Sequence, residues 1–278
     1  MSWAVHGARK QLSMGRALAA HNAGQVRVMM WPFLLLILGP PLVPIWIAGL
    51  VGVARRPEWR SLRFLAAAFP ALLVLVFAMG AQFYYPFGLL SVLFAIGCVP
   101  VERWMVRWRP RIVVAGVALN AAVSLVLGLP LIPLPSLGAT PVPGINQVAR
   151  DTVGWPTYVR QLARVYGGLP PADRRRAVIN YGEAGAVTRY GGPLHLPAVY
   201  SGQNQLYYQA RPPESATVAV FVGGQFDDAR GRFQSCTVAG RLDNRVDVDN
   251  EEQHEPIAVC RGPIGGWRTV WPTLRHED

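Results

Sequence analysis

The chain has 278 residues, of which 51% are hydrophobic and 15% are charged, and its formal net charge is +11. Either a large soluble domain or a membrane protein can have this composition, so the distribution of charge along the chain decides between them. Only Glu58 and Glu102 among the acidic residues precede Asp151, whereas 12 of the 27 basic residues lie before Arg150. A basic chain can bind nucleic acid, but these arginines alternate with apolar stretches too long for a soluble core. We therefore expect no nucleic-acid partner.

Apolar runs cover residues 28–54, 64–81, 83–101 and 112–133. Each is near the ~20 residues that a helix needs to cross the hydrocarbon of a bilayer. The sequence thus predicts a multi-pass transmembrane domain of about four helices over residues 28–133, after an N-terminal juxtamembrane segment, residues 1–27. The first run contains Gly39, Pro40, Pro41 and Pro44, which predict a kinked or locally unwound helix.

The loop charges predict the orientation of these helices. Connections 55–63 and 103–111 carry four arginines each and should be cytoplasmic, whereas the turn at residues 79–87 has no charge and should face outward. Both termini would then be outside. Because Arg9, Lys10 and Arg16 would have to lie outside with no earlier span, we favour the interpretation that further spans precede this sequence.

The second half has the pattern of a small α/β domain on the extracytoplasmic side, residues 145–278. Residues 134–144 are rich in proline and glycine and indicate a linker. An amphipathic helix is expected at 156–167, a short apolar strand at 176–180, a helix at 182–190 and a strand at 216–223. Cys236 and Cys260 are the two cysteines of this half, and on the outer face of a membrane they can form a disulfide or remain two buried thiols.

Two groups of residues are candidates for ligand binding. The outward turn contains Gln82, Tyr84 and Tyr85, whose polar groups could bind the phosphate of a lipid head group, although an interfacial aromatic belt would have the same composition. Gly182, Glu183 and Gly185 follow a predicted strand and open a helix, where free amides could bind an anion. A tight strand-to-helix turn that requires glycines is the alternative.

The remaining patterns argue against several chemistries. The acidic run at 243–252 fails the spacing of a calcium loop, because Glu252 stands where the turn requires glycine. The five histidines have no metal-ligand spacing, and no serine or cysteine lies in a nucleophile motif. No carboxylate falls on the predicted outer face of the membrane half, so we assign no catalytic residue and no metal site.

Several segments together resemble the C-terminal half of bacterial membrane glycosyltransferases of the protein-mannosyltransferase and aminoarabinose-transferase type, which have the multi-span GT-C fold. The segments are GPPLVPIWIAGL (39–50), FYYP (83–86), VGWP (153–156), NYGEAGAVTRYG (180–191), LPAVYSGQN (196–204) and DNEEQHEPIAVCRGP (249–263). The resemblance implies a polyprenyl-phosphate sugar donor. It leaves a divalent cation open as a cofactor of the full-length family, and it matches Tyr84 and Tyr85 to positions at the donor-lipid cavity.

This chain departs from the family in two respects. The N-terminal spans and the outer loop that carries the acidic residue of the family have no counterpart, and Gln82 replaces a residue that is often basic. Catalytic residues therefore cannot be carried over. We expect a glycosyltransferase portion that lacks the catalytic loop, is inactive alone and would need a separate N-terminal half. The alternative is a non-enzymatic membrane-anchored module that binds an extracytoplasmic ligand.

Overall fold

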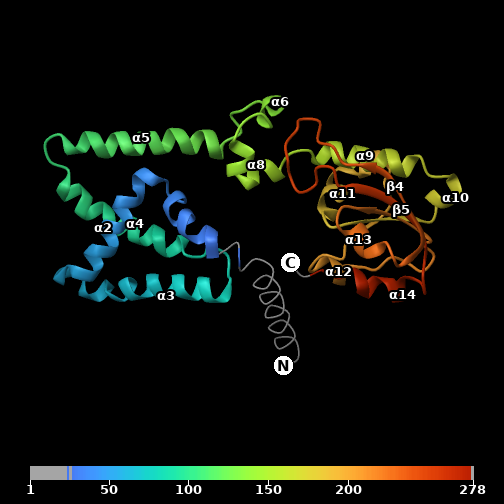
Figure 1. Cartoon of the computed structure of the whole chain (residues 1–278), viewed down its shortest axis with the longest axis horizontal. Coiled ribbons are helices and arrows are strands. Elements are labelled where there is room, and N and C mark those ends of the chain that lie inside the picture. The colour runs from blue at the N-terminus through green and yellow to red at the C-terminus, as the bar shows by residue number, and fades with distance from the viewer. Residues whose placement is uncertain (1–23, 25–26, 277–278) are drawn as a thin grey trace, which may run out of the picture. The chain divides into compact units, whose positions relative to one another are not determined.

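The computed structural model describes residue 24 and residues 27–276, so the predicted N-terminal segment, with Arg9, Lys10 and Arg16, lies almost entirely outside the described residues. The chain forms two compact units that meet between Leu129 and Pro130. The first, called here the helical unit, contains no strand among its described residues. The second, the α/β unit, contains the whole β-sheet (Figure 1).

The helical unit begins with a sharply bent pair of helices, as the sequence predicts. Segment Arg27–Leu36 and segment Pro40–Arg55 meet at 74°, and the second comprises the 3-10 helix η1 (Pro40–Leu42) and α2 (Val43–Arg55). Proline removes backbone donors, and Gly39 at the bend has a φ of 88°. A Cβ at Gly39 would lie 1.6 Å from Oδ1 of Asn120, so only glycine fits here.

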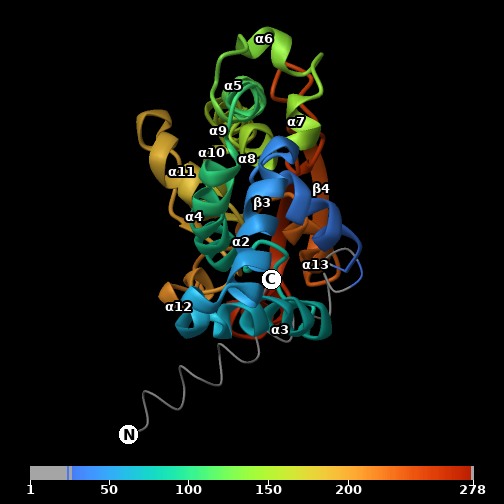
Figure 2. The ribbon, with the colours of Figure 1, turned by 90° about the vertical axis from the view of Figure 1, so that its left-hand side faces the viewer.

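Three further helices complete this unit: α3 (Phe64–Met79), α4 (Phe87–Trp104) and α5 (Arg109–Gly128), with the 3-10 helix η2 (Pro57–Leu62) before α3. Helices α2 and α4 lie side by side (Figure 2). Their backbones approach closely because Gly49 and Gly97 meet at the crossing. A Cβ on either glycine would lie 1.9 Å from a carbonyl oxygen of the other helix.

Two helices of the described residues, α4 with 18 residues and α5 with 20, are long and apolar enough to cross a membrane, and the bent pair would make a third. Helix α3 is apolar but has only 16 residues. The predicted third span begins four residues too early, because residues 83–86 form turns that lead into α4. The predicted fourth span ends too late, because α5 stops at Gly128 before two prolines, Pro130 and Pro133.

The α/β unit is built on a mixed sheet in the order β2-β1-β3-β5-β4. Its strands are β1 (Ala177–Tyr181), β2 (Val199–Tyr200), β3 (Val218–Val222), β4 (Phe233–Arg241) and β5 (Pro256–Pro263). Strands β2, β1 and β3 are parallel, and β5 is antiparallel to both β3 and β4. Every residue of β1 and β3 is buried, as expected of parallel strands covered on both faces.

Helices cover the two faces of the sheet. On one face, α9 (Trp155–Gly167) and α11 (Ala184–Tyr190) enclose a core in which Tyr158 and Leu162 meet Ile179 and Val220. On the other face, α13 (Gln225–Ala229), α14 (Trp267–Val270) and the 3-10 helix η4 (Trp271–Leu274) bury Trp267 against Phe221. The remaining short helices are α6 (Leu134–Leu137), α7 (Val142–Ile145), α8 (Gln147–Asp151), α10 (Pro171–Arg174), η3 (Gly192–Leu194) and α12 (Leu206–Gln209).

The predicted linker at 134–144 is packed structure that belongs to the α/β unit. Its prolines start the short helices α6 and α7, and Leu137 and Val142 are buried. A Cβ at Gly138 would lie 2.5 Å from the carbonyl oxygens of Val246 and Asp247. The segment therefore lies against the loop that follows β4, and the boundary of the unit falls before it, at Pro130.

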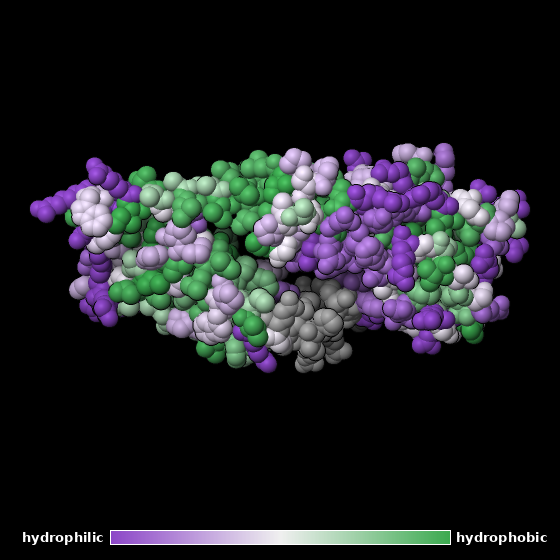
Figure 3. All heavy atoms as spheres, turned by 45° about the horizontal axis from the view of Figure 1, so that its top comes forward, coloured by the Kyte–Doolittle hydropathy of each residue, from purple (hydrophilic) through white to green (hydrophobic). Residues whose placement is uncertain are grey.

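The surfaces of the two units differ in character. The helical unit exposes large apolar side chains along α3, α4 and α5, and Figure 3 shows large hydrophobic areas on this unit. The surface of the α/β unit is largely hydrophilic in the same view. Exposed apolar area on this scale is unusual for a soluble protein and is typical of a surface in contact with lipid.

Candidate functional site

The uncharged turn between α3 and α4 exposes its two tyrosines. Gly80, in the left-handed conformation, ends α3, and hydrogen bonds from the backbone N–H of Tyr85 to Gln82 O and from that of Phe87 to Tyr84 O form the turn. Tyr84 is 49% exposed and Tyr85 is 54% exposed, and their rings meet edge to face with centroids 5.3 Å apart. Neither hydroxyl has a hydrogen-bond partner within the described part of the chain, so both are available to a ligand.

A cation that the sequence did not assign to this turn lies at the same end of the unit. The Nε of Arg27 donates to the carbonyl oxygen of Phe77, near the end of α3, at 3.2 Å, and its guanidinium lies 5.6 Å from the Phe77 ring centre. The segment that carries Arg27 packs on the turn, because Phe33 contacts Phe83 with ring centres 4.4 Å apart. Arg27 is exposed, and among the described residues its Nη groups have no hydrogen-bond partner, so they can donate to an anion.

An apolar cavity of about 540 Å³ lies between three helical segments of this unit. It is bounded by the start of α2, the end of α4 and the first half of α5, and no charged side chain lines it. Representative lining residues are Pro41, Ile45, Pro100, Trp104, Val113 and Gly116. Such a cavity has the size and lining of a site for an apolar ligand, and an acyl or prenyl chain would bury its surface there.

The turn and the cavity lie at opposite ends of α4, which the sequence-based expectation of one shared site did not foresee. Phe87 begins α4 beside the turn, and Pro100 lines the cavity, so the helix rise separates the two by about 20 Å. At the cavity end, Arg103 lies 3.9 Å from Glu58 in η2. The two arginine-rich connections therefore lie together at one end of the unit, as the loop charges predict.

Carboxylates surround the turn at Gly182, Glu183 and Gly185, which the sequence suggests as an anion site. Helix α11 has only seven residues, and the carboxylates of Glu183, Glu251, Glu252 and Glu255 gather at this end of the sheet. Burial raises the pKa of Glu183, and the nearby charge of Glu251 raises it further. An added anion would meet the same repulsion. The alternative, a turn that requires glycines, has no support either, because neither Gly182 nor Gly185 has a positive φ and a Cβ at Gly185 would meet nothing within 4 Å.

A buried tyrosine and a glutamate pair at this edge, which no sequence pattern indicates. The Tyr181 hydroxyl donates a short hydrogen bond to Glu252, 71 residues along the chain. Burial raises the pKa of Glu252 to about 7 against the opposing effect of the Tyr181 hydrogen bond, and the charges of neighbouring carboxylates add to the rise. The same burial and negative charge raise the pKa of Tyr181. Glu252 thus binds a proton near neutral pH.

Two buried asparagines hold the acidic loop at 243–252. Asn250 is buried, and its Nδ2 donates to Val153 O at 2.9 Å while its Oδ1 accepts from the Tyr158 hydroxyl at 2.8 Å. Asn244 Oδ1 accepts from the backbone of Val246 at 3.0 Å. In the part of the chain that the structure describes, no three His, Cys, Asp or Glu side chains are placed to hold a metal ion.

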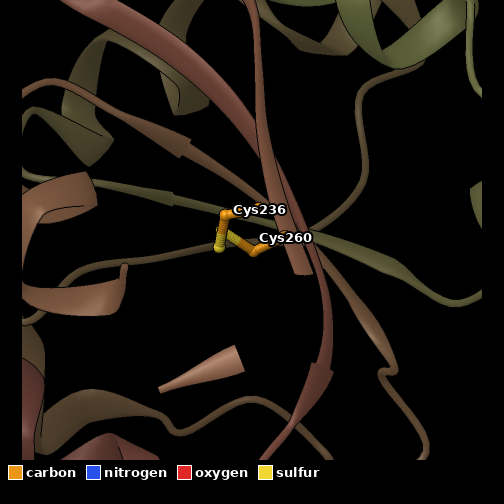
Figure 4. Close-up of a disulfide and its surroundings, with 2 residues drawn as sticks. All are labelled: Cys236 and Cys260. Atoms are coloured by element: carbon orange, nitrogen blue, oxygen red, sulfur yellow. A yellow bond between two sulfur atoms is a disulfide. The ribbon is translucent and has the colours of Figure 1, made fainter. Parts of the chain in front are cut away.

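The two cysteines of the α/β unit form a disulfide (Figure 4). Cys236 of β4 stands opposite Cys260 of β5 in the register of the sheet. The bridge ties the edge strand β4 to the buried strand β5. Cys98, in α4, is a free cysteine.

No family model, curated protein or solved structure matches this chain.

Proposed function

We propose that this chain is the lipid-binding portion of a membrane glycosyltransferase that takes sugar from a polyprenyl-phosphate donor. The observation that carries the proposal is that α4 connects a tyrosine turn, with a cation at the same end of the unit, to an apolar cavity at its other end. A polyprenyl phosphate has the matching polarity, with an anionic head and a long apolar chain. The sequence resemblance points to the same class of donor.

The two ends of the site would hold different parts of the donor. In this proposal Arg27 supplies charge-assisted hydrogen bonds to the phosphate, and Tyr84 and Tyr85 supply hydroxyl donors from the turn at the same end of the unit. The cavity would take part of the prenyl chain, which has to run about 20 Å along α4 to reach it. The proposal therefore requires a long prenyl chain, because a short chain bound at the turn would not reach the cavity.

In the proposed orientation the helical unit crosses the bilayer as a multi-pass protein, with the arginine-rich end in the cytoplasm and the tyrosine turn outside. The pairing of Arg103 with Glu58 supports a common side for the two arginine-rich connections. Helix α5 runs from that end back toward the outside. The α/β unit, which follows α5, is then extracytoplasmic, where a disulfide persists.

Donor binding and sugar transfer are separate in this proposal. Glu58 and Glu102 are the only acidic residues before Asp151, and they lie in η2 and in the last turn of α4, away from the tyrosine turn. Activation of an acceptor hydroxyl needs a base beside the donor phosphate. We expect this chain to bind the donor without transferring its sugar, unless a separate polypeptide supplies that base.

Binding of undecaprenyl phosphate and of undecaprenol to the purified protein in detergent micelles tests the proposal. Replacing Arg27 by glutamine removes the cation at the turn, so the affinity for undecaprenyl phosphate should fall about tenfold, as for a lost charge-assisted hydrogen bond. The affinity for undecaprenol should not change, because it has no phosphate. Arg63→Gln is the matched control, since Arg63 is equally exposed but begins α3 at the other end of that helix.

Two results would contradict this proposal. If Arg27→Gln and Arg63→Gln weaken binding equally, the effect is one of net charge and the turn is not the phosphate site. If the native protein binds neither lipid, the helices serve only as an anchor. The second candidate, a membrane-anchored module whose α/β unit binds a ligand, would then be favoured.

A further inference from the structure

A second cavity, of about 610 Å³, lies within the α/β unit. It is a groove between the C-terminal half of α9, the turn after this helix, the edge strand β4 and its neighbour β5. Val165 and Leu169 from the helix side and Ile257 and Val259 from β5 line it with apolar surface. The groove exists because β4 is an edge strand and α9 leaves it partly uncovered.

Four arginines and no acidic side chain line this groove: Arg164, Arg241, Arg245 and Arg261. Two of them are paired with carboxylates just outside it. Arg261 Nε lies 2.9 Å from Asp173, and Arg245 Nη1 lies 3.2 Å from Asp243. These pairs compensate two of the four charges and hold both guanidinium groups in place.

The other two charges are uncompensated. Arg241 Nη1 donates to the carbonyl oxygen of His254 at 2.8 Å, which orients the group without neutralising it. The side chain of Arg164 has no hydrogen bond or ion pair with any described residue, and it is exposed. Arg164 comes from the helix wall and Arg241 from the strand wall, so the groove presents positive charge from two sides.

We propose that this groove binds a phosphate ester whose organic part is apolar or partly apolar. Guanidinium groups match the oxygens of a phosphate in geometry and charge, and the apolar lining would cover the organic part. The groove is concave and has walls on two sides, which fits a single ligand better than a flat bilayer surface. This inference does not depend on the proposed donor site, because all its residues belong to the α/β unit.

The test uses the full chain in detergent micelles and three probes: phenyl phosphate, inorganic phosphate and phenol. Binding of the two aromatic probes is followed by saturation-transfer NMR. Binding of inorganic phosphate is measured by its competition with phenyl phosphate. We expect phenyl phosphate to bind more tightly than either of its parts. The double variant Arg164→Gln, Arg241→Gln should reduce the affinity for phenyl phosphate at least tenfold, since each arginine contributes a charge-assisted contact.

Arg189→Gln is the matched control, because Arg189 lies on α11 outside the groove and stacks near Tyr190. It removes one positive charge and should leave binding unchanged. The proposal is overturned if the double variant binds phenyl phosphate as well as the native chain does, or if Arg189→Gln weakens binding as much as Arg164→Gln alone. Equal affinity for inorganic phosphate and phenyl phosphate would overturn the assignment of an apolar part. A native disulfide and unchanged amide exchange in β3 and β5 would show that the variants fold.

Discussion

At the scale of single residues, the fold raises the pKa of the Glu252 carboxyl into the neutral range. Burial and three neighbouring glutamates raise its pKa from 4.5 to about 7, although the Tyr181 hydroxyl stabilises the ionised form. In the unfolded chain the same carboxyl loses its proton near 4.5. Between these values the folded chain binds more protons than the unfolded chain, so stability falls as the pH rises.

We expect Glu252→Gln to flatten this dependence. Glutamine can still accept the hydrogen bond from Tyr181 but cannot become charged, so the fall in stability of the α/β unit between about pH 4.5 and pH 7 should be smaller in the variant. The variant should also be more stable than the native protein at pH 8. Amide hydrogen exchange in β1 and β3, corrected for the intrinsic effect of pH, measures this stability in the full chain.

Asp249→Asn serves as a control, because Asp249 is exposed in the same loop. Asp249→Asn should leave the dependence of stability on pH unchanged. A slope in Glu252→Gln as steep as that of the native protein would show that Glu252 is not the proton-binding group.

At the scale of elements, the contact between α2 and α4 depends on two glycines. A Cβ at Gly49 would lie 1.9 Å from Leu93 O, and a Cβ at Gly97 would lie equally close to Ile45 O. These distances are far below any van der Waals contact, so a larger side chain forces the helices apart. The cavity would also change, because Ile45 lines it.

Gly97→Leu should therefore lower the stability of the helical unit by about 3 kcal/mol or more, since the helix backbones cannot relax as a side chain can. Gly88→Leu, also on α4, should have little effect because nothing lies within 4 Å of its Cβ position. Thermal unfolding of the two variants in detergent, followed by loss of the monodisperse peak in size-exclusion chromatography, compares them. Similar unfolding midpoints for both variants would show that α2 and α4 do not pack as closely as described.

The longer helices and two of the five strands could be predicted from the sequence because their signals are local. The bend at Gly39, the amphipathic helix over 156–167 and the buried strands near 178 and 220 follow from proline, periodicity and runs of β-branched residues. The prediction of a linker at 134–144 was wrong because a proline-rich composition is also typical of the first turns of short helices. The burial of Leu137 shows that this segment is packed structure and not a linker. The end of α5 was placed too late because residues 129–133 are apolar but contain two prolines.

The candidate sites were harder to predict because they join residues far apart in sequence. Tyr84 and Tyr85 were identified from one short motif, whereas Arg27 is held at the end of α3 by its contact with Phe77, 50 residues along the chain. Likewise, the pairing of Tyr181 with Glu252 and the convergence of Arg164 with Arg241 depend on the order of the strands. A single sequence contains no signal for these contacts.

At the scale of the whole molecule, the two units carry distinct surfaces and distinct cavities. The helical unit combines spanning-length helices with an apolar cavity, and the α/β unit combines a hydrophilic surface with an arginine-lined groove. In the two proposals, the helical unit binds the donor lipid within the bilayer, and the α/β unit binds a phosphate ester in water. Each activity can be measured without the other.

The dependence of affinity on prenyl chain length tests the central claim most directly, because only a long chain can reach from the turn to the cavity. Each buried methylene contributes about 0.8 kcal/mol, so undecaprenyl phosphate should bind more than tenfold more tightly than geranyl phosphate. Gly116→Phe should remove this advantage by filling the cavity, since a Cβ at Gly116 meets only Pro41, at 3.6 Å. Gly128→Phe, at the open end of the same helix, should preserve it. Equal affinity of the native protein for the two phosphates would contradict the account.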